Sequence, residues 1–168
     1  KLVTQIRCGL SESSLMGIDA GEYPDLPQVQ GKATLKLSFD ALRNLVKRTV
    51  FAVAVTDARP ILTGVLLTAQ GDGITAVAVD GFRLGLAREK LLGGPVEPVS
   101  VVVPGKSMSE IGKIIRETDE ELTLDLSDKH LRMARGNVTF VCRLLEGDFI
   151  NYESVIPTET TTETVVDT

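Results

Sequence analysis

The sequence predicts an α+β fold in which a largely antiparallel sheet carries two helices on one face. Two segments, 38–53 and 105–117, repeat apolar residues at helical spacing. Most of the remaining chain consists of short runs rich in β-branched and apolar residues, which are typical of strands. Short turns rich in Gly, Asn and Asp separate several of these runs, as they do in hairpins. Strands and helices in this arrangement predict one core between a sheet and a helical layer.

The first predicted helix begins after Ser38, because a serine hydroxyl can accept a hydrogen bond from the free amides of a helix N-terminus. Its apolar side chains form one stripe: Phe39, Leu42, Leu45, Val46 and Val50. The opposite face carries Arg43, Asn44, Lys47 and Arg48. This pattern predicts a helix that packs on the core and exposes a basic face.

The second predicted helix begins at about Gly105 and repeats the same division. Its apolar stripe consists of Met108, Ile111, Ile114 and Ile115. The basic residues Lys106, Lys113 and Arg116 lie away from the stripe.

The predicted strands cover about 60–70, 74–80, 82–88, 98–103, 122–126, 130–135 and 138–145. Turn residues at 71–73, 127–129 and 136–137 predict three hairpins. A further turn is indicated by Asp80 and Gly81, which precede Phe82, Arg83 and Leu84 in the stretch VDGFRLGL. This stretch is either a corner between strands or a surface that meets a partner.

The composition excludes several classes of protein. The 168 residues are 43% hydrophobic and 24% charged, and their formal net charge of -5 gives no global sign of nucleic-acid binding. No apolar run approaches the roughly 20 residues that span a bilayer, and no signal peptide is recognisable, so we expect a cytoplasmic protein without a membrane partner. Cys8, Cys142 and the single histidine, His130, suggest neither a disulfide framework nor a zinc site.

No motif predicts catalysis or a cofactor. The PGKS run at 104–107 has Ser100 where a phosphate-binding loop needs its first glycine. His130 has no nucleophile motif around it, and the acidic run at 118–122 lacks the spacing of a calcium loop. We therefore expect no enzyme activity, no metal and no cofactor.

Positive charge is concentrated on the two predicted helices. The segment 38–53 has three basic residues and one acidic residue, and 105–117 has three basic and two acidic residues, in a chain that is acidic as a whole. Lys and Arg favour exposed helix faces for reasons of helix propensity alone. The functional alternative is a basic surface that contacts phosphates without reading bases.

A weak internal repeat predicts the domain organisation. Residues 6–27 and 133–157 both run from a basic residue through a glycine turn and a strand to an acidic residue, an aromatic residue and a final proline. If each segment closes a domain of the same kind, residues 1–29 end one domain, 30–157 form a complete second domain, and 158–168 begin a third.

Several runs together resemble the bacterial DNA sliding clamp family, the β subunit of DNA polymerase III. They are TVFAVAVTDARPILTGVLL, VDGFRL, VVVPGKS and FVCRLLEGDFINYESVIP, in the family's order over nearly the whole chain. The resemblance implies three similar domains per subunit and two subunits closed into a ring, with helices lining the pore and antiparallel sheets outside. It assigns 1–29 to the end of the first domain, 30–157 to the second and 158–168 to the first strand of the third.

The same resemblance implies the partners. Double-stranded DNA would be encircled without sequence preference, and a polymerase, the clamp loader and repair proteins would bind through short linear motifs. The side chains expected to face DNA are Arg43, Lys47, Arg48, Lys106, Lys113 and Arg116. The full-length protein is expected to be a homodimer, whereas this portion alone is expected to be a monomer because it lacks most of both domains that close the ring.

A hydrophobic cleft for partner peptides is also implied. Carried over by position, it consists of Leu62, Val79, Gly81, Phe82, Arg83, Leu84, Ile150, Ser154 and Val155, with Arg59 and Ile61 at its margin. The family commonly has His and Thr at Phe82 and Val79, a Pro-Asp pair at 150–151 and a basic residue at Ser154. These departures predict a more apolar, less positive cleft, of which the third domain would supply the other wall.

Two other classes of function remain as alternatives. One is an enzyme domain whose site lies outside this chain, which a hydrolysis or group-transfer screen on the full-length protein would detect. The other is an assembly domain without a DNA role, for which reversing the helix charges would leave replication unchanged.

Overall fold

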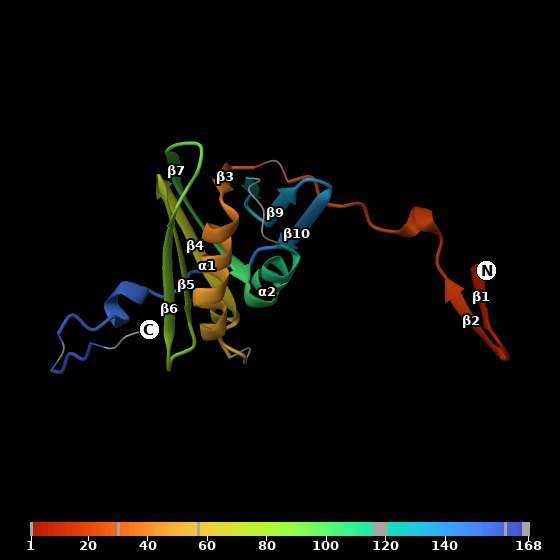
Figure 1. The fold of residues 1–168 in the computed structure, drawn as a ribbon, viewed down its shortest axis with the longest axis horizontal. Helices are drawn as coiled ribbons and strands as arrows, with labels where there is room; N and C mark the ends of the chain where they lie inside the picture. The colour runs from red at the N-terminus through yellow and green to blue at the C-terminus, as the bar shows by residue number, and fades with distance from the viewer. Residues whose placement is uncertain (1, 30, 57, 116–120, 160, 166–168) are drawn as a thin grey trace.

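The computed structural model describes residues 2–29, 31–56, 58–115, 121–159 and 161–165. It consists of a two-stranded hairpin, an extended linker and a larger body that holds two four-stranded sheets and two α-helices. Figure 1 shows the hairpin well separated from the body, with the linker between them. The helices are α1 (Phe39–Thr49) and α2 (Gly105–Ile114).

Among the described residues, all strand pairs are antiparallel, and they form three separate sheets. The hairpin pairs β1 (Leu2–Cys8) with β2 (Ser11–Gly17). The β3 sheet, in the order β10-β9-β8-β3, contains β3 (Ala33–Leu37), β8 (Leu122–Leu126), β9 (His130–Arg135) and β10 (Val138–Arg143). The β4 sheet, in the order β6-β5-β4-β7, contains β4 (Gly64–Gly71), β5 (Gly73–Val79), β6 (Leu84–Lys90) and β7 (Val96–Pro104).

The structure confirms the α+β class and the antiparallel pairing, but it divides the body's strands into two sheets where the sequence pattern suggested one. Strand β3 was not predicted, although its buried Leu35 and Leu37 alternate with exposed Thr34 and Lys36. The strand predicted at 60–70 begins only at Gly64, because the residues before it form a 3-10 helix with a proline in its first turn. The turns at 71–73, 127–129 and 136–137 do join consecutive strands, as predicted.

Helix α1 begins where its capping residue predicts. The Ser38 hydroxyl oxygen accepts a hydrogen bond from the Ala41 amide at 3.2 Å. The helix continues into a short 3-10 helix (Val50–Ala52). Helix α1 packs beside α2. Gly112 of α2 permits this close approach, because a Cβ at that position would lie 2.9 Å from the Val46 side chain of α1. Figure 1 shows the two helices next to each other, with β4, β5 and β6 on the left and β9 and β10 on the right.

The core lies between the helices and the inner faces of both sheets. Its fully buried side chains include Leu35, Leu45, Leu67, Met108 and Leu131, which come from both helices and from both four-stranded sheets. Burying one such side chain stabilises the fold by about 1.5 to 3 kcal/mol. This core holds the helices and sheets as one body, so the surfaces they expose have fixed relative positions.

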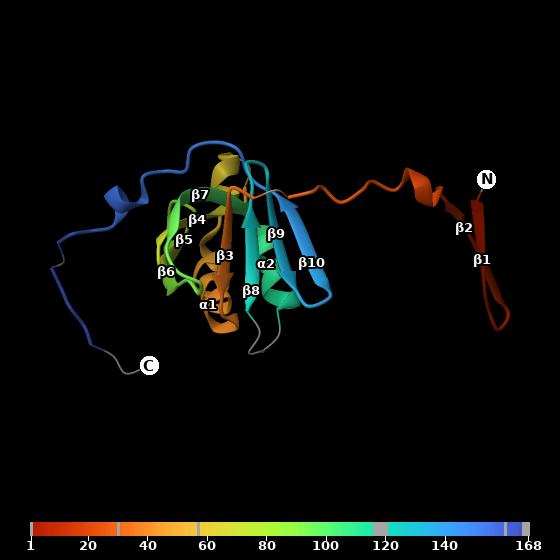
Figure 2. The same cartoon turned by 90° about the horizontal axis from the view of Figure 1, so that it is seen from above.

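The chain after β10 crosses the outer face of the β4 sheet. Figure 2 shows it running from the end of β10 past β7 and over the sheet to the 3-10 helix η4 (Tyr152–Val155). It is held to β7 by a hydrogen bond of 2.9 Å from the Leu145 amide to the Val102 carbonyl. We call residues 144–153 the crossing segment.

Candidate functional site

Helix α1 exposes the basic side chains that the sequence placed opposite its apolar stripe. Arg43, Lys47 and Arg48 are exposed, whereas Leu42 and Leu45 are buried. The Arg43 guanidinium lies 5.9 Å from the centre of the Phe39 ring and 3.9 Å from a carboxylate oxygen of Asp40. Within the described ranges, Lys47 and Arg48 form no ion pair, so their charges are available to a partner.

Helix α2 adds two exposed lysines to the same helical layer. Lys106 lies in the first turn, and Lys113 lies in the last turn, where its ammonium group is 2.7 Å from a Glu110 carboxylate oxygen. Arg116 was predicted to belong to this group, but it lies outside the described residues. We call Arg43, Lys47, Arg48, Lys106 and Lys113 the basic helix surface.

A groove of about 510 Å³ runs between the two helices. Arg43 and Lys47 line it from α1, together with Phe51, and Ser109 and Gly112 line it from α2. No carboxylate is among its lining residues within the part of the chain that the structure describes. The two helices carry more cations than carboxylates, and this net positive charge suits an anionic partner.

The loop between β5 and β6 is built around the carboxylate of Asp80. One of its oxygens accepts hydrogen bonds from the backbone amides of Phe82 (3.0 Å) and Arg83 (3.1 Å), and the other lies 3.0 Å from the Arg83 guanidinium. Gly81 has a φ of 90°, which favours glycine. The hydrogen bond from the Phe82 amide is the largest cause of a lowered pKa at Asp80. Burial opposes this lowering, and the Arg83 amide and guanidinium add to it. The loop presents the Phe82 side chain fully exposed.

The residues predicted to form a peptide cleft differ in how accessible they are. Leu62 and Val79 are buried, with exposed fractions of 8% and 3%. Ile61 and Leu84 are half-buried and pack on a small apolar cluster of Leu66, Val77 and Val102. The fully or largely exposed members are Arg59, Gly81, Phe82, Arg83, Ser154 and Val155. Leu84 therefore offers a more accessible apolar contact than Leu62 does.

That apolar cluster covers the outer face of the β4 sheet. Leu86, Val77, Leu66 and Val102 face one another across its four strands in register. The crossing segment adds Leu145, Phe149 and Tyr152 to the cluster. Gly64 makes room for this packing, because a Cβ there would lie 2.8 Å from a methyl carbon of Leu145.

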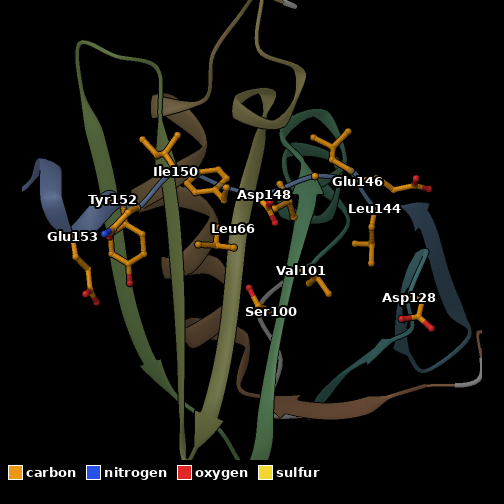
Figure 3. Close-up of a pocket in the computed structure, with 15 residues that line it drawn as sticks. Leu66, Ser100, Val101, Asp128, Leu144, Glu146, Asp148, Ile150, Tyr152 and Glu153 are labelled. Carbon is orange, nitrogen blue, oxygen red and sulfur yellow. The ribbon is translucent and has the colours of Figure 1, made fainter.

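A groove of about 650 Å³ lies where the crossing segment meets the sheet. Figure 3 shows Leu66 on the sheet and Tyr152 on the crossing segment among its lining residues, with carboxylates spread along its length. Of the predicted cleft residues, only Ile150 lines it. Sequence reasoning missed this groove because the crossing segment is irregular before η4, so no period reveals which of its side chains face the sheet.

The described residues contain no group of three or more His, Cys, Asp and Glu side chains that could hold a metal ion. In the same ranges, every buried side-chain nitrogen and oxygen has a hydrogen-bond partner. Cys142 is half-buried as a free thiol, and burial raises its pKa against the opposing effect of a hydrogen bond with Ser107. No helix among the described residues is long and apolar enough to cross a membrane.

Comparison with protein families gives a match over residues 36–151, to the central domain of the DNA polymerase III beta subunit. The chain is 37% identical to the beta sliding clamp of Bacillus subtilis (strain 168) over 166 residues, which cover 99% of this chain and 44% of that protein. It is 35% identical to the beta sliding clamp of Staphylococcus epidermidis over 154 residues, or 92% of this chain and 41% of that protein. The chain thus spans less than half the length of these relatives.

Solved structures give the same result. The crystal structure of the DNA polymerase sliding clamp from Bacillus subtilis superposes with a TM-score of 0.82 at 37% identity, covering 94% of this chain and 41% of that one. The DNA polymerase III subunit beta from Pseudomonas aeruginosa gives a TM-score of 0.83 at 30% identity, covering 95% and 44%. The arrangement of sheets and helices is therefore the clamp fold.

Proposed function

Since this chain belongs to the bacterial DNA polymerase III beta subunit family, we propose that it forms the central part of a ring that encircles duplex DNA and increases polymerase processivity. In this proposal the basic helix surface lines the pore, and the sheets lie outside. The full-length protein closes the ring as a homodimer. The ring has no catalytic step, because its contribution is to keep other proteins on DNA.

The observation that carries the DNA role is the basic helix surface. Five cationic side chains are exposed on two adjacent helices of an acidic chain, and three of them, Lys47, Arg48 and Lys106, have no carboxylate partner among the described residues. Such a surface attracts phosphates through charge without distinguishing bases. It would allow a ring to hold DNA and still slide along it.

The proposed division into domains follows the same ring. We assign residues 1–29 to the end of a first domain, 30–157 to a complete central domain and 158–168 to the first strand of a third. The separated β1–β2 hairpin, the extended linker and the family match at 36–151 support this division.

The outer surface of the central domain is proposed to bind short linear motifs of a replicative polymerase, the clamp loader and repair proteins. Leu84, with Ile61 beside the apolar cluster, would contact an apolar anchor of the peptide. Phe82 and Val155 would contribute exposed apolar area at its edges. The remaining proposed members of the cleft are Arg59, Leu62, Val79, Gly81, Arg83, Ile150 and Ser154.

The DNA role is tested by reversing charge on the basic helix surface. Lys47→Glu, Arg48→Glu and Lys106→Glu are combined in the full-length protein, and its retention on closed circular DNA is measured after loading at several salt concentrations. We expect retention to fall. We also expect the logarithm of the affinity to depend less steeply on the logarithm of the salt concentration, by about one unit of slope for each phosphate that no longer contacts a cation.

A matched control reverses three exposed cations that belong to neither helix, by Arg88→Glu, Lys90→Glu and Lys129→Glu. This variant has the same net charge as the test variant and should remain on DNA much longer. Unchanged retention of the test variant at low salt, or an equal loss in the control, would contradict the proposed DNA-facing role and favour an assembly domain.

A further inference from the structure

The groove where the crossing segment meets the β4 sheet has the apolar side chains of Leu66 and Val102 in its floor, beside the polar Ser100. Leu66 is nearly buried there, whereas Leu145, Phe149, Ile150 and Tyr152 keep part of their surface exposed. The groove has a volume of about 650 Å³, enough to take several side chains of an extended peptide. All of its lining residues belong to the body that carries the two sheets.

The charged residues that line this groove are all acidic among the described residues. Asp128, Glu146, Asp148 and Glu153 line it, and no Lys, Arg or His does so among the described residues. Glu146 is 3.1 Å from the Arg143 guanidinium, and Asp128 forms an ion pair with Lys32. Figure 3 shows the carboxylates distributed along the groove, from Glu153 at one end to Asp128 at the other.

The other two carboxylates, Asp148 and Glu153, are exposed and have no ion-pair partner within the described ranges. An anionic rim above an apolar floor repels nucleic-acid phosphates and complements a segment that combines apolar side chains with Lys or Arg. The carboxylates are not grouped closely enough to hold a metal ion among the described residues. A basic peptide segment is therefore the occupant that the groove fits best.

The groove is continuous with the proposed peptide cleft. Ile150 belongs to both, and one apolar cluster joins Ile61 and Leu84 of the cleft to Leu145, Phe149 and Tyr152 of the groove. A peptide anchored at Leu84 that continues along the crossing segment would pass over the acidic rim.

We propose that this groove binds the basic flank of a partner's linear motif, so that the protein prefers motifs whose apolar anchors are bordered by Lys or Arg. This inference rests on the proposed function, because the anchors themselves occupy the cleft. The groove thus selects for positively charged residues that flank the motif, while the cleft selects for apolar side chains within the motif.

The test uses the full-length protein and three fluorescent peptides with the same Leu and Phe anchors, taken from the replicative polymerase of the same organism. Two residues on each side of the anchors are Lys in one peptide, Gln in the second and Glu in the third. Because exposed ion pairs contribute little individually, we expect the Lys peptide to bind about two- to tenfold more tightly than the Gln peptide at low salt, and the Glu peptide to bind most weakly. Added salt should reduce the difference.

The combined variant Asp148→Asn and Glu153→Gln should bind the Lys and Gln peptides nearly equally. Asp25→Asn with Glu97→Gln removes the same number of exposed charges outside the groove and should keep the Lys preference. A preference that survives in the groove variant would overturn the inference. Equal binding of all three peptides by the unmodified protein would overturn it alone, whereas no binding of any peptide would overturn the cleft as well.

Discussion

The two four-stranded sheets present opposite chemistry on their outer faces. Across the β4 sheet, one row in register consists of Leu86, Val77, Leu66 and Val102. Across the β3 sheet, one row in register consists of Val141, Arg132, Asp125 and Thr34. Both sheets are antiparallel and both bury their inner faces in the same core, so the architecture of the sheets does not cause this difference.

The difference shows which outer face requires a cover. In the β3 sheet, the Asp125 carboxylate accepts hydrogen bonds from the Thr34 hydroxyl at 2.8 Å and the Arg132 guanidinium at 3.0 Å, so the polar groups of the row satisfy one another. The apolar row of the β4 sheet is instead covered by the crossing segment, and an incompletely covered groove remains. An apolar outer face that is only partly covered is a suitable place for a partner.

The largest expected difference between the faces is in stability. Leu66→Ala removes a side chain that is 9% exposed and lies beneath the crossing segment, so we expect the free energy of unfolding to fall by about 2 kcal/mol or more. Thr34→Ala on the polar row loses one exposed hydrogen bond and should cost about 1 kcal/mol or less. Urea unfolding of both variants, compared with the unmodified protein, measures the two changes. Equal costs would break the distinction between an apolar and a polar outer face.

The next largest effect is on peptide binding. Leu84→Ala should lower the affinity of the full-length protein for a polymerase-derived peptide by roughly tenfold, because a well-packed anchor contact contributes on the order of 1 to 2 kcal/mol to binding. Val141→Ala removes a half-buried aliphatic side chain from the outer face of the β3 sheet and should leave the affinity unchanged. Polarisation titrations distinguish the two variants.

Leu62→Ala tests the same cleft less cleanly than Leu84→Ala does. Leu62 is only 8% exposed, so its truncation is expected to lower stability as well as affinity. A loss of affinity in Val141→Ala equal to that in Leu84→Ala would show that the peptide does not distinguish the faces. Retained DNA encirclement in Leu84→Ala would separate the peptide site from the basic helix surface.

Local patterns predicted the parts of the fold that depend on neighbours in sequence. The cap at Ser38 and the apolar stripe after it indicated α1, and the glycine turns indicated the hairpins. The division into two sheets could not be predicted in this way, because β3 pairs with β8 through contacts such as Ala33 with Leu126, which are far apart in sequence. No local period specifies such a partner.

The candidate sites divide in the same manner. Helical period alone separated Lys47 and Arg48 from the buried stripe of α1, and the structure exposes both side chains. The groove between the crossing segment and the β4 sheet forms only where that segment lies across the sheet. No sequence pattern therefore indicated its lining residues, such as Asp148 and Tyr152. The cleft came from family resemblance, which gave positions but not the burial of Leu62.

The smallest expected effect concerns the loop carboxylate at the end of the β4 sheet. Unlike Asp125, which lies within a row of the β3 sheet, Asp80 lies outside the strands and holds the loop that exposes Phe82. The hydrogen bond from the Phe82 amide, opposed by burial and assisted by Arg83, lowers the pKa of Asp80 in the folded state. The ionised Asp80 carboxylate therefore contributes stability above the ordinary aspartate pKa of about 3.9, and this contribution is lost as the pH falls through the folded pKa. Asp80→Asn keeps an oxygen that can accept from the same amides but does not titrate.

The difference in unfolding free energy between the unmodified protein and Asp80→Asn should therefore be constant above about pH 5 and shrink below that pH. A difference that stays constant to about pH 3, or grows there, would show that the carboxylate charge does not hold the loop.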